Sequence, residues 1–278
     1  MPNSPHTTYC NHVYQLTQDV RKFIVEAVAP AIDAQCKDNP AADPRHYRVL
    51  LYPFLRIIRW LITFEKLNHT HDMQAIGTGA RCIFEHYLDL RWLQKFSDET
   101  WFVRFREFAD VDRYMAAKRV VDHKTANPAS LIDTAAPGAF MQRMDAIEPM
   151  SARVLRTWGA DSKGNPRWPR DHWTGEGNLR ERARKIAPEC EDAYVQTYPT
   201  LCALVHPGPS PEHGDFAWLE KQIAFGYFYA FLHAREATVV ICDLVEIRQQ
   251  VTDFEQRMQQ LDQWAAEAMS KLPSDNPP

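Results

Sequence analysis

The chain has 278 residues, of which 45% are hydrophobic and 24% are charged, and its formal net charge is −4. This composition is typical of a globular protein that buries a substantial core, in one large domain or two small ones. The slightly acidic balance excludes a global attraction to nucleic acid or to anionic membranes, so any nucleic-acid site must be a local basic patch.

The N-terminal segment MPNSPHTTYC has neither the charged region nor the apolar region of a secretion signal. The six cysteines are scattered, lie within apolar helical patterns and form no C-x-x-C pair. Such cysteines are typical of reduced core residues. We therefore expect a cytoplasmic protein.

Apolar residues recur at three- and four-residue spacing through most of the chain, which indicates amphipathic helices. A first helix over about 9–35, kinked at Pro30, and a linker make up an N-terminal part, residues 1–45. The main domain, residues 46–250, is expected to contain helices over 46–68 (kinked or begun at Pro53), 72–96, 99–125, around 139–157, after Asn178, over 190–206 and over 215–248. An amphipathic helix and a disordered tail follow in residues 251–278.

Two apolar runs, 49–67 and 216–245, are long enough to be tested as membrane spans. The first contains Arg56, Arg59 and Glu65, and a charge at the centre of a span costs about 2.5–3.5 kcal/mol. Charged residues also divide the second run into pieces well below the roughly 18 residues that a span requires. Both runs are predicted to be buried helices, and no membrane association is expected.

The predicted fold class is all-α, an antiparallel multi-helix bundle, because no strand-like alternation of any length appears. The segments 72–96 and 215–248 are apolar around nearly their whole circumference, which places them at the centre of the bundle. The region around 158–178 is rich in proline, glycine and polar residues, and it is predicted to be a long irregular loop. Loops of this length are usually functional or disordered.

Arg81 and Glu85 are the charged residues of interest on the central helix 72–96. They lie four residues apart and therefore share a face, while apolar side chains cover most of the remaining surface. The pair must therefore meet polar partners or water. A structural ion pair and a polar pocket inside the bundle both satisfy this requirement, and the sequence leaves both open.

The apolar segment before His206 ends at a run of prolines, because a residue that precedes proline is disfavoured in a helix. A histidine at a helix C-terminus is favoured in its charged form, which suits both a cap and a catalytic acid. Four polar residues recur at i, i+4 before this end, provided that Pro199 does not break the helix: Tyr194, Tyr198, Cys202 and His206. We expect this stripe to meet Arg81 and Glu85 in one pocket, with a purely structural seam as the alternative.

Two further patterns carry little information. Arg81 and His86 fit the pattern R-x(4–6)-H, but about two or three such matches arise by chance and residues five apart lie about 140° apart around a helix. His69 and His71 resemble half of a metal site. No further ligands at recognisable spacing complete it, so a solvated turn is predicted, with no metal and no other cofactor.

Aromatic and basic residues alternate in the loop around 158–178. Single-stranded nucleic acids bind to such surfaces, but arginines also pack over indole rings without any ligand. The residues concerned are Trp158, Arg167, Trp168, Arg170, His172 and Trp173. Both interpretations remain open at this point.

Three segments in order, ARCIFEHYLDLRWL, HWTGEGNLRERARKIA and YVQTYPTLCALVHPGP, resemble a family of uncharacterised bacterial all-helical proteins that is distantly HEPN-like. The resemblance covers about residues 50–245. It implies catalytic roles for Arg81, Glu85, Tyr198 and His206, and ligand-binding roles for Trp173, Arg180 and Tyr194, with Gly175 completing the W-x-G motif. The chain departs from the pattern where a serine is expected, at Cys202 or Ala203, and it has no arginine four to six residues before His206.

The resemblance implies a metal-independent RNase of a toxin or phage-defence type, with RNA as its partner. His206 would act as general acid or base, and Arg81 would neutralise a phosphate. Two other classes remain. The chain could be a non-catalytic helical module that binds a protein or small ligand, or a scaffold or homodimer that docks through its C-terminal amphipathic helix.

Overall fold

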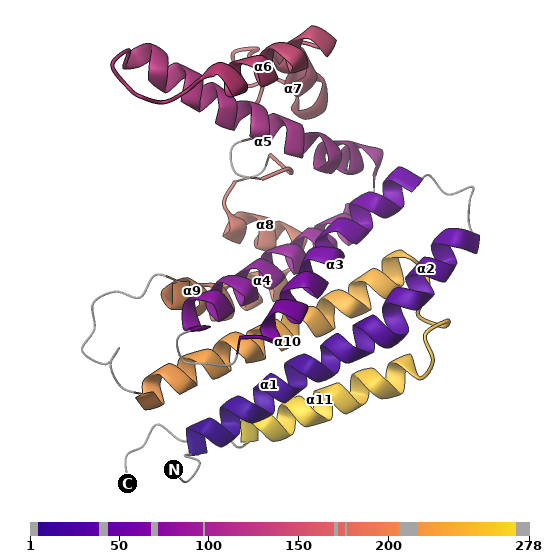
Figure 1. Ribbon diagram of the computed structural model, residues 1–278. Helices are drawn as coiled ribbons and strands as arrows, with labels where there is room; N and C mark the ends of the chain where they lie inside the picture. The colour runs from indigo at the N-terminus through magenta and orange to yellow at the C-terminus, as the bar shows by residue number, and fades with distance from the viewer. Residues whose placement is uncertain are drawn as a thin grey trace. The chain divides into compact units, whose positions relative to one another are not determined.

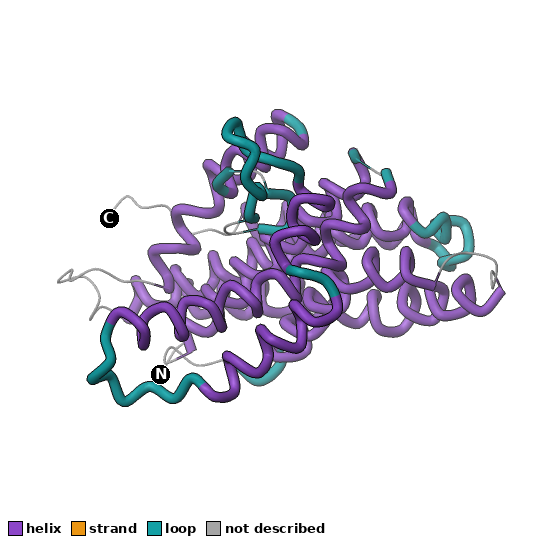
Figure 2. The backbone as a smooth tube through the Cα atoms, turned by 90° about the horizontal axis from the view of Figure 1, so that it is seen from above, coloured by secondary structure: helices purple, strands orange, loops and turns teal. Residues whose placement is uncertain are grey.

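The structure is a computed structural model that describes residues 5–38, 44–67, 72–96, 98–169, 172–175, 177–205 and 216–270. Nearly all of these residues are helical, and they form no strand beyond one isolated bridge between Ala160 and Pro166 (Figure 2). The prediction of an all-α protein is therefore confirmed for the described residues. None of the helices described is long and apolar enough to cross a membrane.

The chain divides into two compact units. The first combines residues 1–95 with 183–278, and the second comprises residues 96–182. This division runs through the range 46–250 that was expected to form one bundle, because residues 96–182 close around a small core of their own. The range 1–45 and the C-terminal helix, in turn, belong to the first unit.

The first unit is a helical bundle. Its elements are α1 (Pro5–Phe23), the π-helical segment η1 (Ile24–Val28), α2 (Ala29–Asp38), α3 (Pro44–Phe64), α4 (Met73–Lys95), α9 (Pro188–Val205), α10 (Phe216–Leu244) and α11 (Phe254–Ser270). The helix α8 (Leu179–Ile186) has residues in both units. In Figure 1, α10 lies between α4 and α1, and α11 runs alongside α1.

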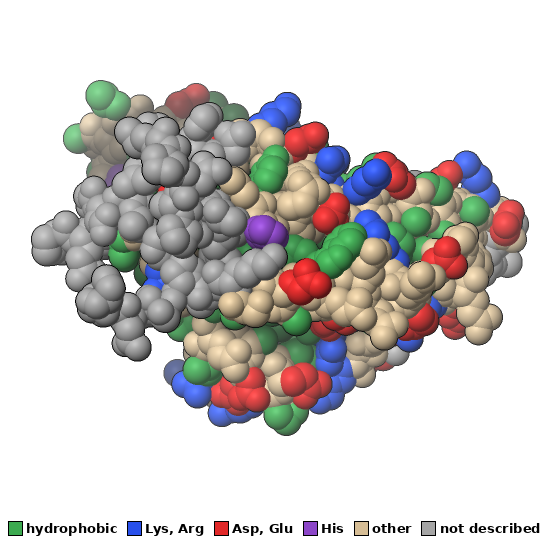
Figure 3. Space-filling model, turned by 90° about the horizontal axis from the view of Figure 1, so that it is seen from below, with side chains coloured by type: hydrophobic (Ala, Val, Ile, Leu, Met, Phe, Trp, Pro, Cys, Tyr) green, Lys and Arg blue, Asp and Glu red, His purple; other side chains and the backbone are tan. Residues whose placement is uncertain are grey.

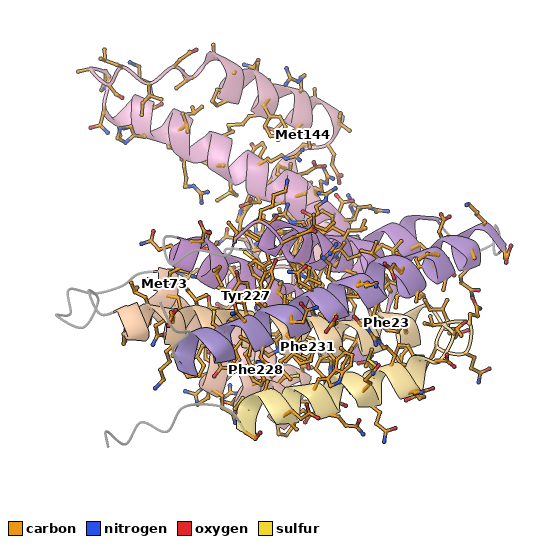
Figure 4. All side chains as sticks on the ribbon, turned by 60° about the horizontal axis from the view of Figure 1, so that its bottom comes forward. Phe23, Met73, Met144, Tyr227, Phe228 and Phe231 are labelled. Carbon is orange, nitrogen blue, oxygen red and sulfur yellow. The ribbon has the colours of Figure 1, made fainter. Side chains whose placement is uncertain are left out.

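The centre of this unit is formed by α4 and α10, as predicted from their apolar circumference. More than half of the residues of α4 are buried, and α10 packs mainly against α4 and α1. Tyr227 and Phe231, which are labelled along α10 in Figure 4, are each 1% exposed. Hydrophobic burial on both sides of α10 therefore holds the bundle together.

Prolines interrupt the helices less than expected. Pro53 lies inside α3, which begins at Pro44, and Pro199 lies inside α9 without breaking it. Ahead of Pro30, the backbone forms the π-helical segment η1, in which the N–H of Ala29 bonds to the carbonyl of Ile24. A π-helical turn is a common way to relieve a local conflict within a long helix.

Glycines let neighbouring helices approach α4 closely. A Cβ atom on Gly77 would lie 2.5 Å from Cβ of Leu204 in α9, and one on Gly79 would lie 2.5 Å from the ring of Phe64 in α3. The two glycines lack the side chains that would keep α3 and α9 away from α4.

The second unit is built on α5 (Glu99–Ala126), α6 (Ala135–Ile147) and α7 (Met150–Trp158). Asp98 caps α5 by accepting a hydrogen bond from the N–H of Trp101. The single helix predicted around 139–157 is two helices, separated next to Pro149. The core residues of this unit are Val111, Tyr114, Met150, Val154 and Trp158.

The region 158–178 is irregular, as predicted, but its described residues are anchored by packing. The indole N–H of Trp158 donates a hydrogen bond of 2.9 Å to the carbonyl of Trp173, and both side chains are buried. Gly175 has a φ of +69° and approaches the Trp158 ring so closely that a Cβ atom would lie 2.8 Å from it. The W-x-G motif therefore has a structural role in this unit.

Candidate functional site

Arg81, Glu85 and Tyr198 form a polar cluster where α4 meets α9. Nε of Arg81 donates a hydrogen bond of 2.9 Å to Glu85 Oε1, and the hydroxyl of Tyr198 donates one of 3.1 Å to the same oxygen. The guanidinium carbon of Arg81 lies 4.9 Å from the centre of the Tyr198 ring. We call these three residues the polar cluster.

The close packing of α4 and α9 builds this cluster. Arg81 and Glu85 face α9 together because they are one helical turn apart. Since α9 continues through Pro199, Tyr194 and Tyr198 also lie one turn apart, and their rings stack with centres 5.0 Å apart. Tyr194 thereby extends the aromatic surface next to Arg81.

The cluster is neither fully buried nor fully solvated, since the side chains of Arg81 and Glu85 are 33% and 35% exposed. Burial alone lowers the pKa of Arg81, but the hydrogen bond and the negative charge of Glu85 raise it above its ordinary value. Burial and the charge of Glu85 raise the pKa of Tyr198. Arg81 is therefore charged and Tyr198 protonated at neutral pH.

Two residues of α3, Arg56 and Trp60, lie near the polar cluster although the sequence pattern did not indicate them as site residues. Burial raises the pKa of the Cys82 thiol, as does the charge of Glu85, and the charges of Arg56 and Arg81 oppose this rise. The indole of Trp60 hydrogen-bonds the Cys82 thiol. Arg56 and Trp60 of α3 therefore lie close to the polar cluster. Only the tertiary packing reveals them.

The remaining predicted site residues are placed differently. His206 lies outside the described residues, directly after the last residue of α9. Trp173 and Arg180 belong to the second unit. Trp173 is 3% exposed and packs edge-on against Trp101 and Phe105, as a core residue does. The structure thus brings together Arg81, Glu85, Tyr198 and Tyr194.

Arg81 and His86 have different partners, as the helical spacing predicted. Arg81 pairs with Glu85, whereas Nδ1 of His86 lies 3.4 Å from a carboxylate oxygen of Asp89. His69 and His71 lie outside the described residues. Within the ranges that the structure describes, no group of three or more His, Cys, Asp or Glu side chains could hold a metal ion.

His233 of α10 is a buried titratable residue that the sequence pattern did not indicate. It is 2% exposed, and neither ring nitrogen has a hydrogen-bond partner among the described residues. Its ring lies against Phe84, Tyr87 and Tyr229, with ring centres 4.7, 5.5 and 6.4 Å away. Burial lowers the pKa of His233 to about 3, so the ring is neutral at physiological pH.

Two surfaces that were predicted to bind partners pack against other residues of the chain. The apolar face of α11, formed by Phe254, Met258, Leu261 and Ala268, is buried, and α11 packs against α1. These four residues therefore pack within the first unit. In the second unit, Trp158 and Trp173 are buried and Trp168 stacks on Tyr114, so the loop exposes little of the aromatic surface expected for nucleic acid.

Among the described residues on the face drawn in Figure 3, acidic and basic side chains are interspersed. This agrees with the small net charge of the chain. A site for an anionic ligand must therefore depend on particular arginines and their immediate surroundings.

Comparison with known proteins places the chain in a family. The profile of a family of unknown function (DUF5677) matches residues 47–214, which is more than half of the chain. The chain belongs to this family. The match spans α3, α4 and α9 and thus includes every residue of the polar cluster. No curated protein and no solved structure matches the chain.

Proposed function

We propose that this family member is a metal-independent RNase of a bacterial toxin or phage-defence type, and that the polar cluster binds the scissile phosphate. The helices of the first unit would then correspond to an antiparallel, HEPN-like bundle. The proposal concerns a local site, since the net charge of −4 offers no general attraction to RNA.

The two Nη groups of the Arg81 guanidinium support this proposal most directly. Its hydrogen bond to Glu85 uses Nε, and its guanidinium makes no other hydrogen bond to a described residue. Both Nη groups are therefore available to two oxygens of one phosphate, the geometry in which arginine binds phosphate best. The Tyr198 ring beneath the guanidinium fixes its orientation.

The aromatic pair next to Arg81 favours RNA over a small inorganic anion. Tyr194 and Tyr198 stack on each other, and Tyr194 is partly exposed. An unpaired base can stack on such a ring while its phosphate contacts a neighbouring arginine. The same contacts are sterically difficult with bases that are paired inside a duplex.

The proposed reaction is attack of a 2′-hydroxyl on the adjacent phosphorus. Glu85 accepts the proton of the 2′-hydroxyl as the O2′–P bond forms, and Arg81 stabilises the charge on the phosphoryl oxygens. The P–O5′ bond then breaks, and His206 donates a proton to the departing O5′. Tyr198 keeps Glu85 in position through its hydroxyl.

Cleavage of labelled single-stranded RNA by the purified full chain, with and without EDTA, tests the proposal. We expect cleavage that EDTA does not reduce, and a loss of about 100-fold or more in Arg81→Ala, Glu85→Gln and His206→Ala. Arg156→Ala is a matched control, because Arg156 also pairs with a glutamate, Glu148, but lies in the second unit. Cleavage that survives Arg81→Ala would rule out this site.

The alternative is a non-catalytic helical binding or scaffold protein. The observation in its favour is that Glu85 already accepts hydrogen bonds from Arg81 and Tyr198, as in a structural ion pair. Under this alternative the full chain does not cleave RNA, and Arg81→Ala lowers only the stability of the protein. RNA binding without cleavage would support a binding role for the same cluster.

A further inference from the structure

A stripe of aromatic and basic residues follows one side of α3. Its members are Tyr52, Arg56, Arg59 and Trp60. Their spacing places them within about 100° around the helix axis. Tyr52 is 51% exposed, Arg59 is exposed, and Arg56 and Trp60 are partly exposed. We call these four residues the α3 stripe.

The α3 stripe is locally basic in a chain whose net charge is negative. The sequence of α3 contains four arginines and one histidine but no aspartate or glutamate. No carboxylate in the described part of the chain pairs with Arg56 or Arg59, although most other arginines of the first unit, such as Arg81, Arg91 and Arg235, have one. Unneutralised arginines between exposed aromatic rings are typical of surfaces that bind single-stranded nucleic acid.

The α3 stripe reaches α4 next to the polar cluster. Trp60 packs over α4 so closely that a Cβ atom on Gly79 would lie 2.7 Å from its ring, and its indole hydrogen-bonds Cys82. Cys82 follows Arg81 in the chain, and the charges of both Arg56 and Arg81 act on its thiol. Trp60 therefore contacts α4 beside Cys82, the residue that follows Arg81 in the chain.

We propose that the α3 stripe is a second nucleotide subsite, so that the ligand is single-stranded RNA of at least two nucleotides. One phosphate contacts Arg81, the strand crosses α4, and the next nucleotide places its phosphate near Arg56 and its base on Trp60. This inference rests on the proposed RNA site and specifies its substrate. A base must be unpaired to stack on an indole, which excludes duplex RNA as the preferred ligand.

Fluorescence anisotropy tests the length requirement with fluorescein-labelled 2′-O-methyl uridylates of one, two, four and eight nucleotides, which lack the attacking 2′-hydroxyl and are not cleaved. For the full chain we expect the Kd to fall as the oligonucleotide grows beyond one nucleotide. In Trp60→Ala and Arg56→Ala, the Kd for four nucleotides should rise about tenfold, and the loss should be larger for the longer ligands. An affinity that does not depend on length would overturn the second subsite.

Matched controls come from α11, where Arg257 lies 5.2 Å from the ring of Trp264. Trp264→Ala and Arg257→Ala remove the same residue types and should leave the Kd unchanged. If Arg81→Ala abolishes binding while Trp60→Ala and Arg56→Ala bind like the unmodified chain, the α3 subsite is wrong and the proposed function stands. If the unmodified chain binds none of the uridylates, both proposals fail.

Protection of Cys82 from alkylation tests whether the RNA crosses α4, and it requires no substitution in the bundle. Cys82 and Cys36 are both partly buried thiols of the first unit. The eight-nucleotide uridylate should slow alkylation of Cys82 by iodoacetamide several-fold and leave Cys36 unaffected, as measured by mass spectrometry of the peptides. Equal alkylation of Cys82 with and without saturating RNA would contradict the proposed path across α4.

Discussion

Tyr198 and His233 approach the ring of Phe84 from different helices, and their polar atoms are in opposite situations. On the α9 side, the Tyr198 ring lies 6.1 Å from Phe84, and its hydroxyl bonds to Glu85. On the α10 side, His233 lies 4.7 Å from Phe84, and neither of its nitrogens has a partner among the described residues. The same core ring thus separates a satisfied polar group from an unsatisfied one.

This difference shows where the bundle tolerates charge. A buried polar group without a partner costs about 1–3 kcal/mol, and His233 limits this cost by remaining uncharged. Arg81 remains charged because it has Glu85 as a hydrogen-bond partner and partial access to water. The α9 side therefore accommodates charged side chains, whereas we expect the α10 side to make stability sensitive to pH.

The largest expected effect is the acid sensitivity caused by His233. Its pKa is lowered from 6.5 to about 3 in the folded chain, so the unfolded chain binds a proton more readily. Stability due to neutral His233 is therefore complete above pH 6.5 and is lost as the pH falls toward 3, by about 5 kcal/mol in total and about 2 kcal/mol at pH 5. His233→Phe should remove this dependence in urea unfolding curves measured at pH 5, 6.5 and 8.

His123→Phe is the control for this experiment, because His123 is an exposed histidine on α5. The control should keep the pH dependence of the unmodified chain. If His233→Phe and the unmodified chain lose the same free energy of unfolding between pH 6.5 and pH 5, then His233 finds a partner in solution and the contrast between the two sides disappears.

The next effect concerns the distance between α9 and α4. Gly77→Ala should lower the free energy of unfolding by about 1–3 kcal/mol, because the new Cβ meets Leu204 at 2.5 Å and α9 must move. Gly138→Ala in α6 is the matched control, since its Cβ meets no atom within 4 Å, and it should stabilise by up to about 1 kcal/mol. Urea unfolding that ranks the two variants equally would show that α9 is not held close to α4.

The ion pair between Arg81 and Glu85 should contribute less to the free energy of unfolding. Its two side chains are about one-third exposed, so Arg81→Ala should cost about 1 kcal/mol, well below the 3–5 kcal/mol typical of a fully buried pair. A double-mutant cycle with Glu85→Ala measures the coupling between the two residues. A coupling above about 3 kcal/mol would show that the cluster is closed to water, which would contradict a site open to a phosphate.

The sequence predicts the α9 side better than the α10 side, for a physical reason. Arg81 with Glu85 and Tyr194 with Tyr198 each follow from i, i+4 spacing within one helix, which is a local property. The contact between these two pairs was expected from their polarity, because buried polar groups require partners. His233 sits in an apolar helix. Of the rings around it, Tyr229 is a local neighbour four residues earlier in α10, whereas Phe84 and Tyr87 come from α4 through tertiary packing.

The sequence pattern is equally uninformative about which helices pack together. Residues 96–182 form a separate unit because α5, α6 and α7 share a core, and helical periodicity alone does not indicate which helices pack together. The apolar face of α11 was equally compatible with an external partner and with α1, and the structure shows α1. Arg56 and Trp60 become relevant only when α3 is placed against α4.

The smallest expected effect isolates the hydroxyl of Tyr198. Tyr198→Phe keeps the ring that contacts Phe84, Tyr194 and Arg81 but removes one hydrogen bond to Glu85. Because the acceptor is partly exposed, the free energy of unfolding should fall by about 0.5–1 kcal/mol, the low end for a hydrogen bond.

Tyr194→Phe is the matched control for Tyr198→Phe. The hydroxyl of Tyr194 makes no hydrogen bond to a described residue, so its removal should leave stability within about 0.5 kcal/mol of the unmodified chain. The two variants are compared by urea unfolding at pH 7. If they are equally stable, the Tyr198 hydroxyl contributes nothing to holding Glu85, and the contrast between the satisfied and unsatisfied sides of Phe84 depends on Arg81 alone.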